Sequence, residues 1–564
     1  MSETTGATRT FARVIVMVTL LARCATAEPI PPAWGDQGDG TYKNPVLPGD
    51  YQNTDVVRVG DDYYYISATK ALSPGMAVLH SKDLVNWRHV GHVVPDITVF
   101  HARFNHDRME GDQRGVWAGA IAHHGGKFYV YFTTPDEGLY VSTATDPAGP
   151  WAPLTHMMRA PGWDDPCPFW DDDGQPYLVL TQFARDPANG KTYNTHLYKM
   201  TADALGLVAE SDRIIHQSPG AEASKLFKRG GVYYHFFSHV TPEGRIPMMH
   251  RAKEIAGPYE TRQLLHVNAK ENGEPNQGTL LETPGGQWVF LTHHGRGGWE
   301  GRPASLLPVT WAEGWPLVGS VGADGIGNMV WSGRKPIGGF ARSAPQTDDE
   351  FDGRELAPQW EWYFQPRAGK WSLAERPGFL RLHALKRLAP GNLRKTPNIL
   401  TQRPLRADGS AATVKLSLDG MADGQTAGLC FLGKASATIG VTQAGGERAF
   451  VYIEDAKATA GPALARGTNA AWLRVSWNHA GLATFQASTD GERFTTIGNP
   501  FQITSLGSHL GAKLGIYTTN DAADAGHVDV DWFHYSQAVT QREANGGAAW
   551  NRPSSARATN VRGR

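Results

Sequence analysis

Gly125-Gly126-Lys127-Phe128-Tyr129-Val130-Tyr131-Phe132 is the stretch that decides the fold. A glycine turn leads into aromatic and β-branched residues, which is the pattern of a strand that follows a tight turn. Four further runs of this kind recur at a roughly regular spacing: Asp62–Ser67, Gln175–Leu180, Val232–Phe237 and Gln287–Leu291. Each unit is long enough for a four-stranded sheet. Five such units predict a five-bladed β-propeller over residues 40–337.

A second all-β region follows the propeller. The pattern changes after Lys335-Pro336-Ile337-Gly338-Gly339, and stretches such as Ala412–Leu418 and Trp472–Trp477 then alternate with the period of two of half-buried antiparallel strands. This predicts a β-sandwich over residues 346–540. Two domains also agree with the length of 564 residues, because single cores stop growing near 250 to 300 residues.

The chain carries almost no net charge. There are 54 Lys and Arg against 55 Asp and Glu, so the sequence has no electrostatic footprint for nucleic acid. Eighteen Trp and 18 Tyr supply flat apolar faces on which sugar rings can stack. An uncharged partner such as a saccharide is therefore expected.

The first residues have the organisation of an export signal. Arg9 and Arg13 precede the apolar run Val14–Ala22, and the small residues Ala25-Thr26-Ala27 follow. Residues 1–27 are therefore predicted to be a signal peptide of a periplasmic or extracellular protein. No later run is long and apolar enough for a membrane span, so no membrane insertion is expected. The polar segment 541–564 is predicted to be a disordered tail.

Three acidic segments stand where blade strands begin. They are residues 49–60, 163–174 and 220–228. A pair of carboxyl groups that meets in the funnel of a propeller could cleave a glycosidic bond. Each segment also has a plain structural interpretation: Asp165 before Pro166 fits a turn, and an isolated Glu222 fits a solvated strand edge.

Together these segments resemble glycoside hydrolase family 43. Matching stretches run in consistent order from about residue 42 to 320 and include Asn44-Pro45-Val46-Leu47, Leu79–Trp87, Gly115–Ala118, Asn276-Gln277-Gly278 and Gly301–Pro316. The C-terminal part is similar to the concanavalin-like sandwich of the xylosidase-type members, through Trp371-Ser372-Leu373, Leu400–Arg403 and Val528–Phe533. The resemblance implies an exo-acting, inverting hydrolase that releases xylose or arabinose from xylan or arabinoxylan and their oligosaccharides.

Carried over to this sequence, the resemblance makes Glu222 the general acid. Asp165 is then the carboxylate that orients the acid and raises its pKa, because a second negative charge favours the protonated form. Arg302 is expected to hydrogen-bond the sugar in the innermost subsite, and Trp117 to form part of the sugar-facing wall. For Arg302 a salt bridge between blades, and for Trp117 a place in the core, are the structural alternatives.

One position departs from the family pattern. The family's general base is an Asp, and the matching position here is Asn53, which accepts no proton at any useful pH. In an extended stretch Asp55 faces the same side as Asn53, so Asp55 is the expected base and Asn53 a substrate-binding residue. Asp50 as the base, or a loss of hydrolytic activity, are the alternatives.

No cofactor is expected to be required. Some members hold an axial metal through a His, but Gln277 stands at that place, so we expect it to bind substrate and expect no axial metal. A structural Ca²⁺ between Asp348–Asp352 and Asp529–Asp531 is an alternative to solvated turns. A carbohydrate-binding protein built on an inactive hydrolase is the second hypothesis for function, favoured by Asn53. A retaining fructosidase-type enzyme is disfavoured because its nucleophile motif is missing.

Overall fold

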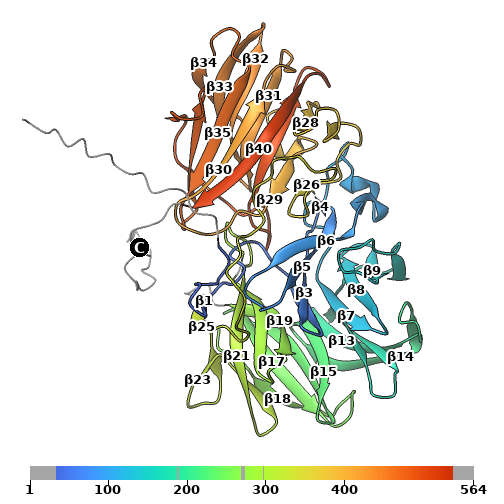
Figure 1. The fold of residues 1–564 in the computed structure, drawn as a ribbon. Helices are drawn as coiled ribbons and strands as arrows, with labels where there is room; N and C mark the ends of the chain where they lie inside the picture. Colours follow the sequence, from blue (N-terminus) through green and yellow to red (C-terminus); the bar gives the residue numbers. More distant parts are fainter. Residues whose placement is uncertain (1–32, 187–189, 268–273, 296, 538–564) are drawn as a thin grey trace, which may run out of the picture.

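The computed structural model describes residues 33–186, 190–267, 274–295 and 297–537 (Figure 1). This part of the chain is all-β, as predicted: its helical segments are the short 3-10 turns η1 (Ile97–Val99), η2 (Ala102–Phe104) and η4 (Leu393–Lys395). None of its helices is long and apolar enough to cross a bilayer. The predicted signal peptide, residues 1–27, and the predicted disordered tail, 541–564, lie outside the described residues.

Five four-stranded antiparallel sheets form the propeller. Their strands are β2 (Asp55–Val59), β3 (Asp62–Ser67), β5 (Gly75–Ser81) and β6 (Arg88–Val94); β7 (Gly119–His124), β8 (Lys127–Thr134), β9 (Gly138–Ala144) and β10 (Thr155–Met158); β11 (Trp163–Trp170), β12 (Pro176–Asp186), β13 (Gly190–Met200) and β14 (Leu207–Ser218); β15 (Ala221–Arg229), β16 (Val232–Val240), β17 (Arg245–Ala252) and β18 (Glu260–Gln263); β19 (Pro275–Glu282), β20 (Trp288–His294), β21 (Ala304–Ala312) and β22 (Trp315–Val318).

The recurring aromatic runs are the second strands of the blades, and the turns before them are the hairpins that join first and second strands. Gly60, Gly126, Gly174, Gly231 and Gly286 in these turns all have positive φ, which glycine adopts without steric cost. The first strands β2, β7, β11, β15 and β19 contact one another around a ring. Side chains at the start of these five strands therefore converge on one funnel.

The ring is closed by the segment before the first blade. Strand β1 (Thr41–Lys43) pairs with β25 (Ser332–Arg334), which follows the last blade and the small hairpin β23 (Ser320–Val321) and β24 (Gly327–Asn328). The Asn44 side chain accepts from the N–H of Leu306 and donates to its carbonyl. These contacts hold the last blade against the first residues of the domain.

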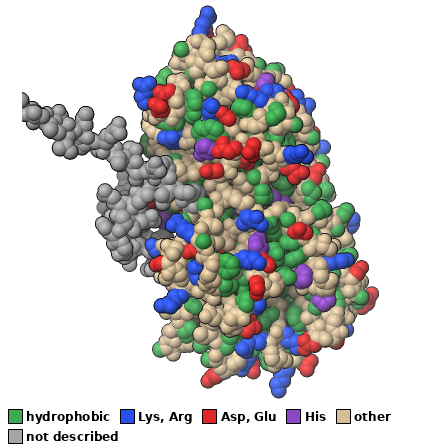
Figure 2. Space-filling model, in the orientation of Figure 1, with side chains coloured by type: hydrophobic (Ala, Val, Ile, Leu, Met, Phe, Trp, Pro, Cys, Tyr) green, Lys and Arg blue, Asp and Glu red, His purple; other side chains and the backbone are tan. Residues whose placement is uncertain are grey.

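Two eight-stranded antiparallel sheets form the C-terminal sandwich. One sheet contains β34 (Lys457–Ala463), β33 (Glu447–Glu454), β32 (Ala437–Ala444), β31 (Gln425–Leu432), β39 (Lys513–Asn520), β29 (Leu400–Gln402), β26 (Glu361–Tyr363) and β4 (Leu72–Ser73). The other contains β27 (Trp371–Ser372), β28 (Leu380–His383), β40 (His527–Gln537), β30 (Ser410–Ser417), β35 (Ala470–Trp477), β36 (Leu482–Ser488), β37 (Thr495–Thr496) and β38 (Phe501–Gln502). Figure 2 shows basic and acidic side chains interspersed over the visible face.

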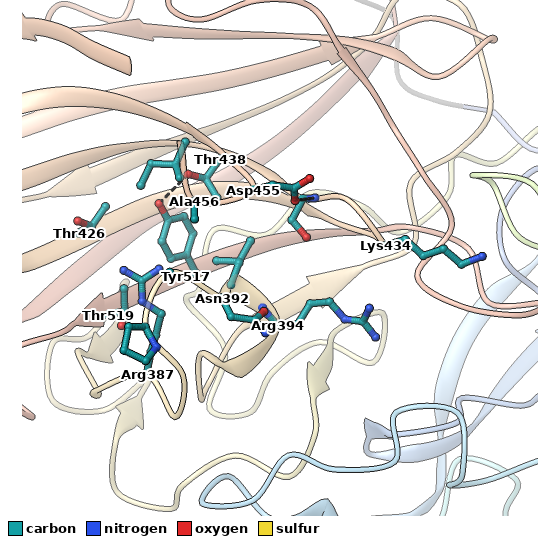
Figure 3. A pocket seen from close by; sticks show the side chains of 15 residues that line it. Arg387, Asn392, Arg394, Thr426, Lys434, Thr438, Asp455, Ala456, Tyr517 and Thr519 are labelled. Atoms are coloured by element: carbon teal, nitrogen blue, oxygen red, sulfur yellow. Dashed lines mark hydrogen bonds between the residues drawn. The ribbon is translucent and has the colours of Figure 1, made fainter. Parts of the chain in front are cut away.

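A pocket of about 320 Å³ lies between the first of these sheets and the loop that carries η4 (Figure 3). Its polar lining includes Thr426, Thr438, Tyr517, Arg387 and Arg394. Tyr517 donates a hydrogen bond to Thr438, and the two arginines form ion pairs with Asp521 and Asp112. The charges of both arginines are thus matched by carboxylates of the protein itself.

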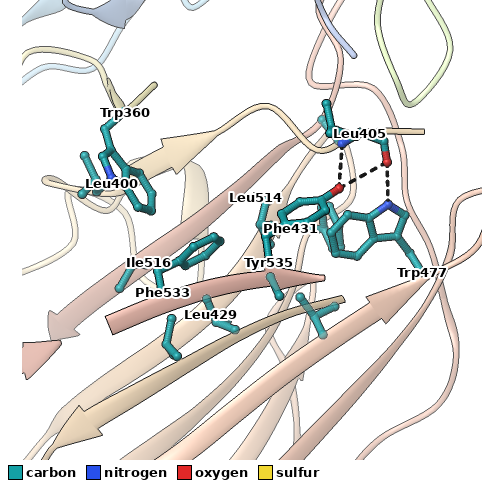
Figure 4. Packing of buried hydrophobic residues seen from close by; sticks show 14 of the residues in the cluster. Trp360, Leu400, Leu405, Leu429, Phe431, Trp477, Leu514, Ile516, Phe533 and Tyr535 are labelled. Atoms are coloured by element: carbon teal, nitrogen blue, oxygen red, sulfur yellow. Dashed lines mark hydrogen bonds between the residues drawn. The ribbon is translucent and has the colours of Figure 1, made fainter. Parts of the chain in front are cut away.

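The two domains share one hydrophobic core. The propeller strand β4 is the last strand of a sandwich sheet, because Leu72 and Ser73 pair with Tyr363 and Trp362. One buried cluster contains propeller residues such as Leu47 together with sandwich residues such as Leu514, Phe533 and Tyr535. Figure 4 shows the sandwich side of this cluster, where Trp477 donates to the carbonyl of Leu405 and Leu405 donates to the Tyr535 hydroxyl.

A buried ion pair also joins the domains. The Asp50 carboxylate lies 2.7 Å from the Lys513 ammonium, and both side chains are almost fully buried. Asp50 accepts a further hydrogen bond from the N–H of Gly511 at 3.1 Å. A buried charge without a partner is costly, so removal of either residue alone should destabilise the interface.

Lys513→Met is therefore expected to lower the free energy of unfolding by about 3–5 kcal/mol, because it leaves the Asp50 carboxylate buried without its cation. Adding Asp50→Asn to Lys513→Met should recover much of this loss. Urea unfolding followed by tryptophan fluorescence measures both effects. A single variant as stable as the wild type would contradict the interpretation.

Candidate active site

Asp165 and the segment that carries Glu222 lie in contact. The Oδ2 atom of Asp165, on β11, accepts a hydrogen bond at 2.8 Å from the N–H of Ala223, the neighbour of Glu222 on β15. Asp165 and Ala223 have φ values of 51° and 66°, and the strand register shifts at both places. Such bulges re-aim side chains, and here they bring two carboxyl groups from adjacent blades together.

The carboxyl group of Asp165 is buried beside a like charge. Burial and, after it, the negative charge of Glu222 raise the pKa of Asp165 to about 6, while the hydrogen bond from Ala223 acts in the opposite direction. Gln277 donates from Nε2 to Oδ1 of Asp165 at 3.1 Å. The predicted substrate ligand Gln277 thus holds Asp165, and its side chain is buried.

Glu222 also has a cationic neighbour. Arg245, at the start of β17, donates from Nε to Oε1 of Glu222 and contacts Glu274 through Nη1 at 3.1 Å. The Glu222 side chain is 14 % exposed and is held by Arg245. Arg245 orients the predicted acid, and its own pKa is raised by Glu222 and Glu274 despite burial.

Arg302 is buried with unused donors. Its Nε and Nη2 atoms are enclosed and have no hydrogen-bond partner within the described residues, although the residue is only 3 % exposed. Burial and then the charge of Arg245 lower the pKa of Arg302 to about 10. Buried polar groups are rarely left unpaired, so these donors indicate a place for ligand oxygens.

Asn53 and its neighbours add further unpaired polar atoms. The N–H of Asn53 donates to Nδ1 of His293 at 3.0 Å, and burial lowers the pKa of His293 well below its usual range. The Asn53 Oδ1, the His293 Nε2 and both amide atoms of Gln52 are buried without a partner in the described part of the chain. Together with Arg302, they mark a polar binding site.

Trp117 forms a half-buried wall beside a buried cation. Its indole donates to the carbonyl of Gln113 at 2.7 Å, and the Lys70 ammonium lies 4.6 Å from the ring centroid. Burial lowers the pKa of Lys70 to about 8, against the charge of Asp164. Two cations, Lys70 and Arg114, thus lie against the Trp117 ring.

Asp55 lies deeper and joins several blades. Its Oδ2 accepts from the N–H of Ile121 at 2.9 Å, and its Oδ1 accepts from the Thr279 hydroxyl and lies 3.2 Å from the Lys225 ammonium. These donors come from β7, β19 and β15. Both oxygens of Asp55 are therefore engaged, and its role as the base stays a prediction.

The sandwich contributes one side of the site. His509 stands in the loop before β39; burial, and then the charges of Arg302, Arg245 and Lys70, lower its pKa to about 2. A Cβ placed on Gly297 would lie only 2.8 Å from the His509 Cα, so the loops of the two domains are in close contact. The funnel is bounded by both domains.

Sequence reasoning did not assign roles to five residues of this site: Lys70, Asp164, Arg245, His293 and His509. Four of them stand outside the acidic segments, in a connection between strands, in other strands or in the other domain, and no local motif marks them. Asp164 precedes Asp165 directly, and this adjacency was the one available signal.

The carboxylates proposed for Ca²⁺ already have protein donors. Arg381 lies 2.7 Å from Asp529, and Lys415 lies 2.6 Å from Asp531. Asp349 accepts from the Trp360 indole at 2.7 Å. No group of three or more His, Cys, Asp or Glu within the described residues is arranged to hold a metal. The two segments therefore do not fit a calcium site.

Comparisons with known proteins agree with this geometry. Residues 42–316 match the model of glycosyl hydrolases family 43, and residues 348–536 match that of the beta xylosidase C-terminal concanavalin A-like domain. A beta-xylosidase of Formosa agariphila is 36 % identical over 548 residues, covering 89 % of this chain and 91 % of the relative. A non-reducing end alpha-L-arabinofuranosidase of Bacteroides ovatus is 29 % identical, covering 61 % and 65 %. The crystal structure of a xylan beta-1,4-xylosidase from Bacillus halodurans superposes with a TM-score of 0.74 at 23 % identity over 88 % and 100 % of the chains, which shows a shared fold.

Asp165→Asn is expected to stabilise the chain more at high pH than at low pH. The pKa of Asp165, about 6, lies above its ordinary value of 3.8, so the folded state favours the protonated group. The stability that the protonated form supplies is present below about pH 4 and is lost as the pH rises through about 6. Asn cannot ionise and avoids this loss. Thermal unfolding at pH 4.5 and pH 8 measures the difference; a change in Tm independent of pH would contradict it.

Proposed function

The chain belongs to glycosyl hydrolases family 43, and on this premise we propose that it releases terminal xylose or arabinose from the non-reducing ends of xylan or arabinoxylan and their oligosaccharides. The observation that carries the proposal is the contact between the Asp165 carboxylate and the backbone beside Glu222, in a funnel lined by unpaired polar atoms. A carboxyl pair serves bond cleavage, and the free donors of Arg302 suit the hydroxyls of a sugar.

In the proposed reaction Glu222 acts as the general acid. Its proton passes to the glycosidic oxygen as the bond to the anomeric carbon breaks, so that the leaving sugar departs as an alcohol. Asp165 holds the acid strand through Ala223 and keeps a second carboxyl group close to Glu222. A water attacks from the opposite face and gives up a proton to a base, which inverts the anomeric configuration. No cofactor takes part, as is typical of the family.

Exo action is supported by the boundary of the funnel. Trp117 lies against Lys70, Arg302 is buried, and His509 of the sandwich loop is close enough to feel the charges of Arg302, Arg245 and Lys70. A funnel bounded in this way by two domains favours one terminal sugar over an internal chain segment. Xylose and arabinose differ in stereochemistry and ring form, and the relatives include enzymes named for each.

The second candidate is a carbohydrate-binding protein without catalysis. Asn53 at the position of the family base favours it. The Glu222–Asp165 arrangement argues against it, because a pure binder gains nothing from a buried carboxyl group held beside a second carboxyl group.

Assays with p-nitrophenyl β-D-xylopyranoside and p-nitrophenyl α-L-arabinofuranoside separate the two candidates. We expect turnover of at least one substrate, and we expect proton NMR to show the inverted anomer of the sugar as the first product. Binding of xylo-oligosaccharides without turnover at any pH would rule out the enzyme and leave the binding protein as the function.

Glu222→Gln tests the acid. Loss of the proton donor should lower kcat by about 10²–10⁴-fold on xylobiose, whose leaving group needs protonation. The loss should be much smaller on aryl glycosides with acidic phenols, because those leaving groups depart unaided. Equal losses on both substrate types would contradict the assignment of Glu222 as the acid.

We also propose that the chain is exported to the periplasm or the medium. The charged start with Arg9 and Arg13, the apolar run Val14–Ala22 and the small residues Ala25–Ala27 support this. Edman sequencing of protein recovered from a secretion-competent host should begin at residue 28. A cytoplasmic product that retains residues 1–27 would refute it.

A further inference from the structure

The proposed hydrolysis needs a base, and the family position does not supply one. An amide cannot take up the proton of the attacking water. The Oδ1 atom of Asn53 is buried and unpaired among the described residues, and its N–H is bonded to His293. Asn53 is thus suited to accept a hydrogen bond from water, while the proton has to pass to another group.

Two acidic residues of the same segment are already committed to cations. The Asp50 carboxylate lies 2.7 Å from Nζ of Lys513 and faces the sandwich. The Asp55 carboxylate lies 3.2 Å from Nζ of Lys225 and has two further donors. Transfer of a proton to either carboxylate would break a buried ion pair and leave the lysine unpaired, which is costly.

Asp164 has fewer commitments. Its Oδ1 accepts one side-chain hydrogen bond, from the Thr133 hydroxyl at 2.9 Å. In the part of the chain that the structure describes, no cation lies within ion-pair distance of Asp164; the Lys70 ammonium is close enough only to act through space. The residue is 7 % exposed, is the second residue of the inner strand β11 and directly precedes Asp165. Burial and the charge of Asp165 raise the pKa of Asp164.

Asp164 and Glu222 lie on different sides of Asp165. The carbonyl of Thr133, the partner of Asp164, accepts the N–H of Trp117 at 2.8 Å, so Asp164 belongs to the Trp117 side of the funnel. Glu222 belongs to the Arg245 side. Asp164 is bonded to Thr133 of β8, and Glu222 stands on β15, so the two residues are held by the blades on either side of β11. An inverting enzyme needs its two carboxyl groups on opposite sides of the scissile bond.

We propose that Asp164 is the general base of this chain. It takes the role that the family assigns to the Asp at the position of Asn53. The oxygen of water bonds to the anomeric carbon as its proton passes to the Asp164 carboxylate. The bond from the anomeric carbon to the leaving oxygen breaks, and that oxygen takes the proton of Glu222. Solvent then removes the proton from Asp164 and returns one to Glu222, which restores both groups.

Asp164→Asn is the first test. On p-nitrophenyl glycoside we expect kcat to fall at least 100-fold and the acidic limb of the kcat/KM pH profile to disappear, since that limb reports protonation of the base. Adding Asn53→Asp to Asp164→Asn should restore kcat at least tenfold. Asp172→Asn, an acid-to-amide change at an exposed site eight residues along the chain, is the matched control and should keep the wild-type profile.

Thr133→Val provides a second test in a chain that keeps Asp164. Loss of the hydrogen bond to Oδ1 should shift the acidic limb to higher pH, because an ionised carboxylate loses a donor. Azide added to Asp164→Ala should restore turnover and give a glycosyl azide of inverted configuration, which a residue with a structural role would not cause.

The outcomes separate this inference from the proposed function. A wild-type chain without turnover overturns the hydrolase itself. If the wild type is active, two results would each overturn the Asp164 assignment. One is an acidic limb that persists in Asp164→Asn, and the other is a limb that Thr133→Val leaves in place. If the acidic limb of the pH profile disappears in Asp55→Asn, and circular dichroism shows that this variant is folded, the base is Asp55.

Discussion

The site depends on one buried carboxylate at the centre of the ring. Asp55 receives the N–H of Ile121, the hydroxyl of Thr279 and the ammonium of Lys225, which belong to three other blades. Strand β7 follows Trp117, while β19 carries Gln277 and β15 carries Glu222. Because a buried anion has to keep its donors, these contacts fix the strands relative to one another. The functional side chains project from the ends of strands whose spacing is set in this way.

The sandwich is joined closely to the propeller that carries the candidate site. A propeller strand completes one of its sheets, the hydrophobic core runs across the boundary, and Asp50 and Lys513 form a buried pair between the domains. Gly511 and His509 come from the same loop, so the contacts that hold the domains together also place His509 beside Arg302 and Arg245.

Several features of the funnel disfavour the folded state. Asp165 is a buried acid beside another acid and has a left-handed backbone conformation. The donors of Arg302 and the amide of Gln52 are buried without partners among the described residues. Such groups lower stability unless a ligand satisfies them. Their concentration at one end of the propeller, beside Glu222, is what a site shaped for a polar ligand requires.

The sequence by itself determined the all-β class, the five blades and the sandwich, because glycine turns and alternating strands are local patterns that backbone sterics impose. Its motifs also predicted roles for Glu222, Asp165, Arg302 and Trp117. Only the tertiary structure decided what surrounds them. Lys70, Arg245 and His509 reach the funnel from other strands or from the other domain, and the ion pairs of Asp50 and Asp55 join residues far apart in the chain. Electrostatic partners depend on distance in space, and that distance is absent from a linear pattern of residues.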